Sequence, residues 1–338
     1  MRTISGIETS GIQDNIDLHG AVSAATELPS HDQVVCTLFE KDFHFGVAAL
    51  ANSLVRGGFR GLIWAGYRGE LPGWTRALPK LSNGLFNVGG ATLGFEEIAT
   101  GKHFTQFKPE FMATLFRKRI ARKYLWYFDP DITVRCSWSF FEQWVEFGVA
   151  LCQEITNGTM PSTHPIRCAW TAAARGAGWG DPIHEQERYY NAGFVGVSRD
   201  FNGFLTTWQS ALDLAYSNGV GTGVLKKGGR EFAFNTPDQD ALNIAAMYSD
   251  VPLSAIGPEG MGFTPGGFTM YHTLGRAKPW RKNFLRYALS GVPPSNGDKH
   301  YLQNAEGPIS PYTQGHLGSL RLQAAIATAI GRFYRKGA

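Results

Sequence analysis

The chain has 338 residues, of which 43% are hydrophobic and 18% are charged. This composition excludes a disordered chain and provides a core for one large α/β domain or two small ones. The net charge of +4 suits a phosphate-bearing small molecule as well as a polyanion, but no run of like charges is long enough to require a nucleic acid.

The four cysteines are widely spaced and include no Cys-x-x-Cys pair, which argues against a zinc knuckle. Cys36 and Cys152 lie in apolar runs, where buried free thiols are expected. The N-terminus has no signal-peptide pattern, and no apolar run approaches the ~20 residues of a membrane span. These observations predict a reducing, cytoplasmic setting without a transmembrane segment.

The first ordered elements predict a parallel sheet covered by helices. Residues 1–32 are polar and weakly patterned, so we expect an N-terminal arm. A β-branched and apolar run at 33–39 predicts a buried strand, 46–57 predicts a helix that stops at Gly57-Gly58, and 61–66 predicts a second strand. A strand–helix–strand opening is typical of such sheets.

Further along the chain, we expect a basic helix near 111–122, followed by a strand at 124–128 that ends at Asp129. The cations of 117–123 are expected on the solvated side of that helix. The remaining expected elements are a helix at 137–155, an irregular region at 156–188, a strand at 189–197 and a helix at 238–247. We expect mostly loop with short elements at 251–316, and a helix at 316–334.

The terminal helix places Leu322, Ile326, Ile330 and Phe333 roughly in line and ends in basic residues. It could touch an anionic membrane surface. The alternative is a helix that packs on the domain and has a basic end.

Asp129-Pro130-Asp131 follows an aromatic strand, and ligands bind beyond the carboxyl ends of strands in open α/β sheets. In extended backbone, residues i and i+2 point to the same side, and Pro130 disfavours helix at Asp129. Two neighbouring carboxylates repel each other, and a divalent cation relieves this. The alternative is a helix N-cap plus a solvated turn acid.

The stretch 270–280, Met-Tyr-His-Thr-Leu-Gly-Arg-Ala-Lys-Pro-Trp, combines a metal ligand, a flexible glycine and a cation. His272 with two carboxylates suits Mn²⁺ or Mg²⁺ rather than tetrahedral zinc. Gly275 lets backbone approach a diphosphate, and Lys278 is a point charge for phosphate oxygens. The alternative is a surface histidine in a loop anchored by Trp280.

Four separated segments resemble, in the same order, motifs of GT-A fold nucleotide-diphospho-sugar transferases, most closely the family 8 group of glycogenin and lipopolysaccharide galactosyltransferases. The family's L-Y-L-D-A-D, F-N-A-G, D-Q-D-x-L-N and H-x-x-G-x-x-K-P-W motifs correspond to 125–131, 190–193, 238–243 and 272–280. Departures are Pro130 inside the acidic motif, where the family has a small residue, and an unusual loop at 66–74.

The resemblance implies a single Rossmann-like GT-A domain at 33–285, with a mostly parallel central sheet flanked by helices. Residues 1–32 and 286–338 have no counterpart in the family, and we expect 286–338 to form a C-terminal extension with a terminal helix. The resemblance also implies that Asp129, Asp131 and His272 bind Mn²⁺ (or Mg²⁺). Gly275 and Lys278 would contact the diphosphate of a UDP-sugar donor.

The resemblance implies that the transferred sugar is surrounded by Asn191, Asp238 and Gln239. Positive charge develops at the anomeric carbon during transfer, and a carboxylate or amide oxygen can stabilise it. The alternative for Asp238 and Gln239 is a helix N-cap and its first turn, and for Asn191 a strand-end turn residue. Asp240 is expected as a first-turn acid facing the helix dipole.

In this fold the nucleobase lies at the end of the first strand. The backbone near Phe39 and the ring of Phe43 could therefore hold it, although Phe43 could equally belong to the core. Lys108 could reach the donor or lie on the surface.

The expected enzyme is a metal-dependent hexosyltransferase that uses a UDP-sugar and an acceptor hydroxyl. Retention of anomeric configuration is implied by the resemblance only. The acceptor is a sugar, glycan, natural product or protein hydroxyl, with candidate sites at 156–188 and 251–270. Alternatives are an inverting transferase with Asp238 or Asp240 as general base, a non-catalytic nucleotide-sugar binder, and a polyanion binder that uses the cations of 117–123.

Overall fold

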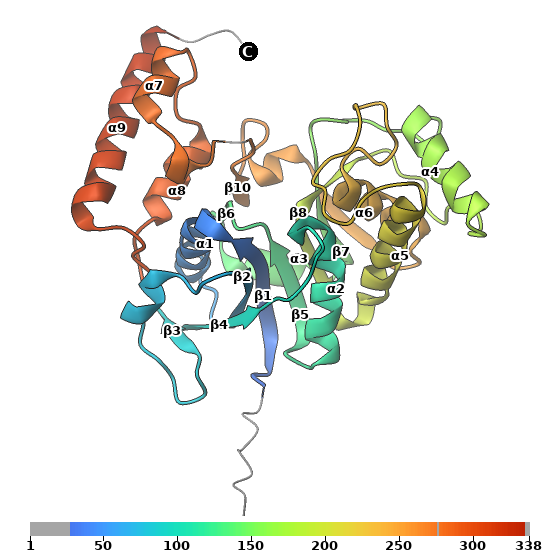
Figure 1. Cartoon of the computed structure of the whole chain (residues 1–338), viewed down its shortest axis with the longest axis horizontal. Helices are drawn as coiled ribbons and strands as arrows, with labels where there is room; N and C mark the ends of the chain where they lie inside the picture. The colour runs from blue at the N-terminus through green and yellow to red at the C-terminus, as the bar shows by residue number, and fades with distance from the viewer. Residues whose placement is uncertain (1–27, 276, 335–338) are drawn as a thin grey trace, which may run out of the picture.

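The computed structural model describes residues 28–275 and 277–334. The expected N-terminal arm lies almost entirely outside the described residues. An eight-stranded sheet forms the centre of the molecule (Figure 1). In spatial order, its strands are β3 (Phe86–Val88), β4 (Ala91–Glu97), β2 (Leu62–Arg68), β1 (His31–Glu40), β5 (Ala121–Phe128), β8 (Tyr190–Ser198), β7 (Val149–Gln153) and β9 (Leu253–Ile256).

Most strands of this sheet run in one direction. The pairings β4–β2, β2–β1, β1–β5 and β7–β9 are parallel, whereas β3–β4, β5–β8 and β8–β7 are antiparallel. Within this sheet, β3 and β8 therefore run against the other strands. The predicted α/β class with a mostly parallel sheet is confirmed.

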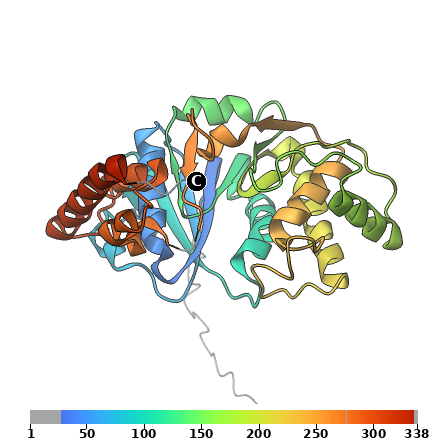
Figure 2. The ribbon, with the colours of Figure 1, turned by 90° about the horizontal axis from the view of Figure 1, so that it is seen from above.

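Helices cover both faces of the sheet, because strand residues alternate between two cores. Val34, Cys36 and Leu38 of β1 face one core, and Val35 and Phe39 face the other. Figure 2 shows the strands between two groups of helices. The helices are α1 (His44–Arg56), α2 (Phe104–Arg117), α3 (Trp138–Trp144), α4 (Pro165–Gly176), α5 (Gly203–Ser217), α6 (Pro237–Tyr248), α7 (Phe284–Leu289), α8 (Asn296–Asn304) and α9 (Gln314–Phe333).

A separate two-stranded antiparallel pair joins β6 (Ile132–Val134) to β10 (Met270–His272). It links the segment after β5 to a segment more than a hundred residues later. α8 closes over this pair: the Thr133 hydroxyl lies 2.8 Å from Nδ1 of His300 in α8.

The predicted helix at 137–155 is confirmed only in its first part and is wrong for the rest. The chain forms α3, breaks at Gly148 and continues as β7. Gly148 has φ +144°, a backbone conformation that residues other than glycine rarely adopt. β7 is then buried between β8 and β9, and a short apolar run of this kind cannot be assigned to helix or strand by periodicity alone.

Two further expectations need correction. The region 156–188 contains α4, which starts with Pro165 and is capped by the side chain of His164. The cations of 117–123 do not form one helix face, because α2 ends at Arg117 and β5 starts at Ala121. Three of these cations have acidic neighbours, in the pairs Lys118–Glu96, Arg122–Asp32 and Lys123–Glu146.

The C-terminal helices form their own core against α1. Ala49 of α1 belongs to the same buried cluster as Phe284, Tyr301 and Leu317. The face of α9 that packs consists of Leu317, Leu320, Ala324 and Ala327, whereas the predicted line includes Leu322 and Phe333, which are exposed. None of the helices within 28–275 and 277–334 is long and apolar enough to cross a membrane. All four cysteines lie in the described ranges and are free there, and Cys36 and Cys152 are buried as predicted.

Candidate active site

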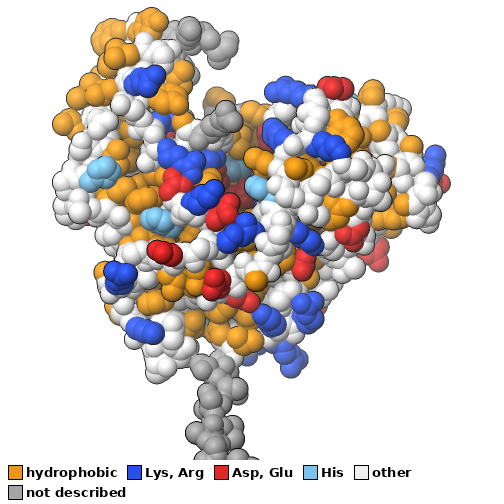
Figure 3. Space-filling view, in the orientation of Figure 1, with side chains coloured by type: hydrophobic (Ala, Val, Ile, Leu, Met, Phe, Trp, Pro, Cys, Tyr) orange, Lys and Arg blue, Asp and Glu red, His pale blue; other side chains and the backbone are white. Residues whose placement is uncertain are grey.

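A cavity of about 940 Å³ lies beyond the carboxyl ends of β1 and β5. Acidic, basic and histidine side chains gather in the hollow between the α7–α9 side and the α4–α6 side of the molecule (Figure 3). Every candidate residue from the sequence lines this cavity: Phe39, Phe43, Lys108, Asp129, Asp131, Asn191, Asp238, Gln239, His272, Gly275 and Lys278.

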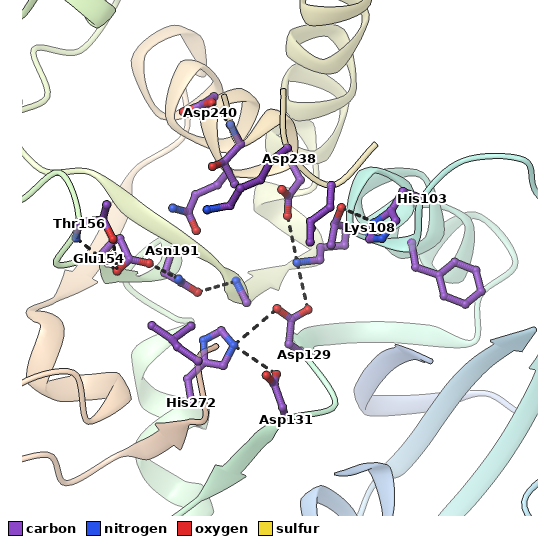
Figure 4. Close-up of a pocket in the computed structure, with 18 of the residues that line it drawn as sticks. His103, Lys108, Asp129, Asp131, Glu154, Thr156, Asn191, Asp238, Asp240 and His272 are labelled. Carbon is purple, nitrogen blue, oxygen red and sulfur yellow. Dashed lines mark hydrogen bonds and ion pairs between the residues drawn. The ribbon is translucent and has the colours of Figure 1, made fainter. Parts of the chain in front are cut away.

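Asp129, Asp131 and His272 converge at one wall of the cavity (Figure 4). Asp129 leaves the end of β5, and its backbone N–H donates to the Gly193 carbonyl at 2.7 Å. His272 reaches the two acids because β10 pairs with β6, where it lies opposite Ile132. Nε2 of His272 lies 3.2 Å from Oδ1 of Asp131 and 3.8 Å from Oδ2 of Asp129.

The chemistry of this triad fits a hard divalent cation. One ligand atom from each residue lies within 4.8 Å of the others, and two carboxylates with one imidazole suit Mn²⁺ or Mg²⁺. Nε2 is the ring nitrogen of His272 that faces the acids. The other ring nitrogen, Nδ1, is buried and has no hydrogen-bond partner among the described residues.

Lys278 already supplies a positive charge to this site. Its Nζ donates to Asp131 and, at 2.8 Å, to the Thr273 carbonyl. Burial alone would raise the pKa of Asp131, but the interactions with His272 and Lys278 outweigh it and hold that pKa well below its usual value. Asp131 is therefore a carboxylate, ready to bind a cation.

Gly193, in β8, leaves room for the triad. A Cβ atom at this position would lie 2.6 Å from Cε1 of His272 and 3.0 Å from Oδ2 of Asp129. It would also lie 2.8 Å from Oδ1 of Asn191, which accepts the Gly193 N–H at 2.8 Å. No larger side chain fits here unless the triad moves.

Lys108 links the triad to Asp238 at the start of α6. It projects from α2, and its buried Nζ lies 3.0 Å from Asp129 Oδ1 and 3.3 Å from Asp238 Oδ2. It also donates to the Ala192 carbonyl at 2.9 Å. Burial favours the neutral amine, yet the two carboxylates outweigh it and raise the pKa of Lys108. Lys108 is thus a buried counter-charge between the two acids.

Glu154 is a cavity residue that the sequence did not single out. It follows β7, is buried, and accepts hydrogen bonds from Asn191 Nδ2 and from the Ile155 N–H, the latter at 2.9 Å. The mistaken helix at 137–155 concealed it. The signal was a short apolar run, 149–152, followed by a carboxylate and a Thr-Asn-Gly turn.

The first turn of α6 brings three polar side chains to the cavity. Asp238 is buried against Lys108, and the Gln239 side-chain oxygen accepts the Ala192 N–H at 3.2 Å. Asp240 is buried rather than solvated, and it accepts from the Tyr189 hydroxyl and the Thr236 N–H, each at 2.7 Å. Despite these hydrogen bonds, burial raises the pKa of Asp240 to about 8.

Two aromatic rings and a glycine turn also line the cavity. Phe39 is the penultimate residue of β1 and is buried. Phe43 is half-buried between Trp280 and Arg281, and the ring centroids of Phe43 and Trp280 are 5.4 Å apart. Gly275 has φ +95° and open space around its Cα.

No family model matches the chain, and no curated protein matches it in sequence. Solved structures do match. A galactosyltransferase LgtC in complex with donor and acceptor sugar analogues is 13% identical, with a TM-score of 0.48, covering 85% of this chain and 99% of that one. The glycosyltransferase GlyE of Streptococcus pneumoniae TIGR4 is 14% identical, with a TM-score of 0.48 and coverage of 89% and 64%.

The bifunctional glycosyltransferase WbbM is 15% identical, with a TM-score of 0.45 and coverage of 86% and 52%. These structural neighbours of the chain are glycosyltransferases.

Proposed function

We propose that this protein is a metal-dependent glycosyltransferase that moves a hexose from a UDP-sugar to an acceptor hydroxyl with retention of configuration. The observation that carries the proposal is the convergence of Asp129, Asp131 and His272, whose ligand atoms lie within 4.8 Å of one another in a 940 Å³ cavity. Asn191, Asp238 and Gln239 line the same cavity.

Asp129, Asp131 and His272 would hold Mn²⁺ or Mg²⁺, which supplies charge neutralisation to the departing diphosphate. Lys278 adds a positive charge next to this site. Gly275 has no side chain, so its backbone can approach the diphosphate closely. Phe39 and Phe43 offer a surface for the base. Asp238 and Gln239 place oxygens on the sugar side, where they can oppose positive charge that develops in transfer.

The test is a thermal-shift screen of nucleotide sugars with and without Mn²⁺. Ligand that binds only the folded protein raises its stability by about 2.7 kcal/mol at a concentration 100 times Kd. One UDP-sugar is expected to raise Tm, and only with the metal. Asp131→Asn should lose that response, whereas Asp250→Asn, at an exposed position, should keep it. An equal response without metal, or in Asp131→Asn, contradicts the proposal.

Turnover and stereochemistry are checked with the donor that the screen selects. Release of UDP over time separates an enzyme from a nucleotide-sugar binder. The anomeric proton coupling of the product separates retention from inversion.

A further inference from the structure

Two cations on the cavity wall have no partner among the described residues. The described lysines and arginines that line the cavity are Lys108, Lys226, Arg230, Lys278 and Arg281. Lys108, Lys278 and Arg281 form ion pairs with carboxylates. Lys226 and Arg230 form no hydrogen bond or ion pair with any residue of 28–275 or 277–334, and both are exposed. Their charges are therefore available to a ligand.

Nearby acids do not neutralise this pair. Asp240 lies close enough to Lys226 to interact with its charge, but burial raises the pKa of Asp240 to about 8, so it is largely protonated at neutral pH. The carboxylate of Glu231 turns back over Gly229 and does not line the cavity.

The loop that carries both cations is fixed to the body of the protein. Within it, Nδ2 of Asn235 donates to the Lys227 carbonyl at 3.0 Å, and the Lys227 N–H donates to the Asn235 carbonyl at 2.9 Å. Gln106 of α2 donates to the Val224 carbonyl at 2.6 Å, and the His103 N–H donates to the Thr222 carbonyl at 2.8 Å. The loop at 218–236 is thus a wall of the cavity.

This wall is not the one proposed for the donor diphosphate. Lys278 and Gly275 follow β10, on the side of α7–α9, whereas Lys226 and Arg230 precede α6 (Figure 1). Leu225 and Phe232 belong to the same loop as Lys226 and Arg230, and they line the cavity together with Ile166, Thr156 and Asn157.

We propose that the acceptor carries an anionic group, a phosphate or a carboxylate, which Lys226 and Arg230 bind. Leu225, Ile166 and Phe232 would cover an apolar face of the same molecule, and its hydroxyl would point toward Asn191 and Asp238. This inference rests on the proposed function. In the transfer, the bond from the anomeric carbon to the diphosphate oxygen breaks, a bond to the acceptor oxygen forms, and the hydroxyl proton leaves with the diphosphate.

The test titrates the full chain, saturated with Mn²⁺ and UDP, with three sugars in a calorimeter. Methyl glucoside is neutral, methyl glucuronide carries a carboxylate, and glucose 6-phosphate carries a phosphate. At least one anionic sugar is expected to bind ten-fold or more tightly than the neutral one. Which of them does so identifies the anion.

Lys226→Glu/Arg230→Glu should remove this preference, and the milder Lys226→Gln/Arg230→Gln should reduce it. The matched control, Arg76→Glu/Lys80→Glu, makes the same charge change at two exposed positions outside the cavity and should retain it. Equal binding of neutral and anionic sugars, or an equal loss in the control, overturns the proposal.

Donor binding is measured in the same samples. If the Lys226/Arg230 variants weaken UDP binding as much as sugar binding, the two cations serve the donor and the proposal is overturned. If UDP does not bind in the presence of Mn²⁺ even to the native chain, the proposed function itself fails, and this is seen before any sugar is added.

Discussion

The Nζ atom of Lys108 lies 3.0 Å from Oδ1 of Asp129, and only 1% of the Lys108 side chain is exposed. Removing one partner of a buried ion pair leaves an uncompensated charge and costs about 3–5 kcal/mol. Lys108→Met should therefore lower the free energy of unfolding in urea by about 3 kcal/mol. Lys102→Met, which breaks the more exposed Lys102–Glu110 pair, should cost less than about 1 kcal/mol. Equal costs would show that the buried charge is not stabilising Asp129.

Gly193→Ala should weaken Mn²⁺ binding, because the added methyl group would lie 2.6 Å from His272 and 3.0 Å from Asp129. Overpacking of this kind also lowers stability by about 1–3 kcal/mol. A Mn²⁺ titration followed by thermal shift measures the first effect. Gly203→Ala is the control, because a Cβ atom there meets nothing within 4 Å. An unchanged titration midpoint in Gly193→Ala would show that the triad is not the metal site.

Asp240 should make stability depend on pH. Burial raises its pKa to about 8 in the folded chain, against about 3.9 when unfolded. Between these values the folded state holds one more proton, so the free energy of unfolding falls as pH rises, by up to about 1.4 kcal/mol per unit.

This contribution is fully present below about pH 4 and lost by about pH 8. Asp240→Asn should remove it, so the variant gains stability relative to the native chain between about pH 5 and pH 8. Urea unfolding at several pH values across this range measures the difference. Asp250→Asn should track the native chain, and a parallel pH profile for Asp240→Asn would contradict the buried, protonated state.

Glu154→Gln should disturb Asn191 without changing side-chain size. Glu154 accepts hydrogen bonds from Asn191 and from backbone N–H groups, and an amide replaces one of these acceptors by a donor. A buried unsatisfied donor costs about 1–3 kcal/mol, so stability should fall by that amount and UDP release should slow. Glu187→Gln, at an exposed position, is the control. Native-like turnover by Glu154→Gln would show that activity does not depend on Glu154 holding Asn191 in place.

The sequence predicted the elements that have strong local signals. The strand–helix–strand opening, the strand before Asp129, the strand at 190–198 and the helix at 237–248 are confirmed. The structure also brings Asp129, Asp131 and His272 together, as expected. The expectation that His272 joins the two acids came from the family resemblance, because His272 lies 141 positions after Asp131 in the chain.

What the sequence did not predict depends on tertiary contacts. β7 follows a positive-φ glycine, and its strand conformation comes from pairing with β8 and β9. Glu154 was missed for that reason. The burial of Asp240 was missed because a first-turn acid is expected in solvent, and only the packing of Tyr189 and Thr236 around it removes it from water.

The shared core of Ala49, Phe284 and Leu317 and the closure of α8 over β6 and β10 have a practical consequence for protein engineering. A chain that ends near residue 285 would lack α8, which packs against the strand that carries His272. It would also expose part of α1 to solvent. Crystallisation or expression trials should therefore keep residues 286–334.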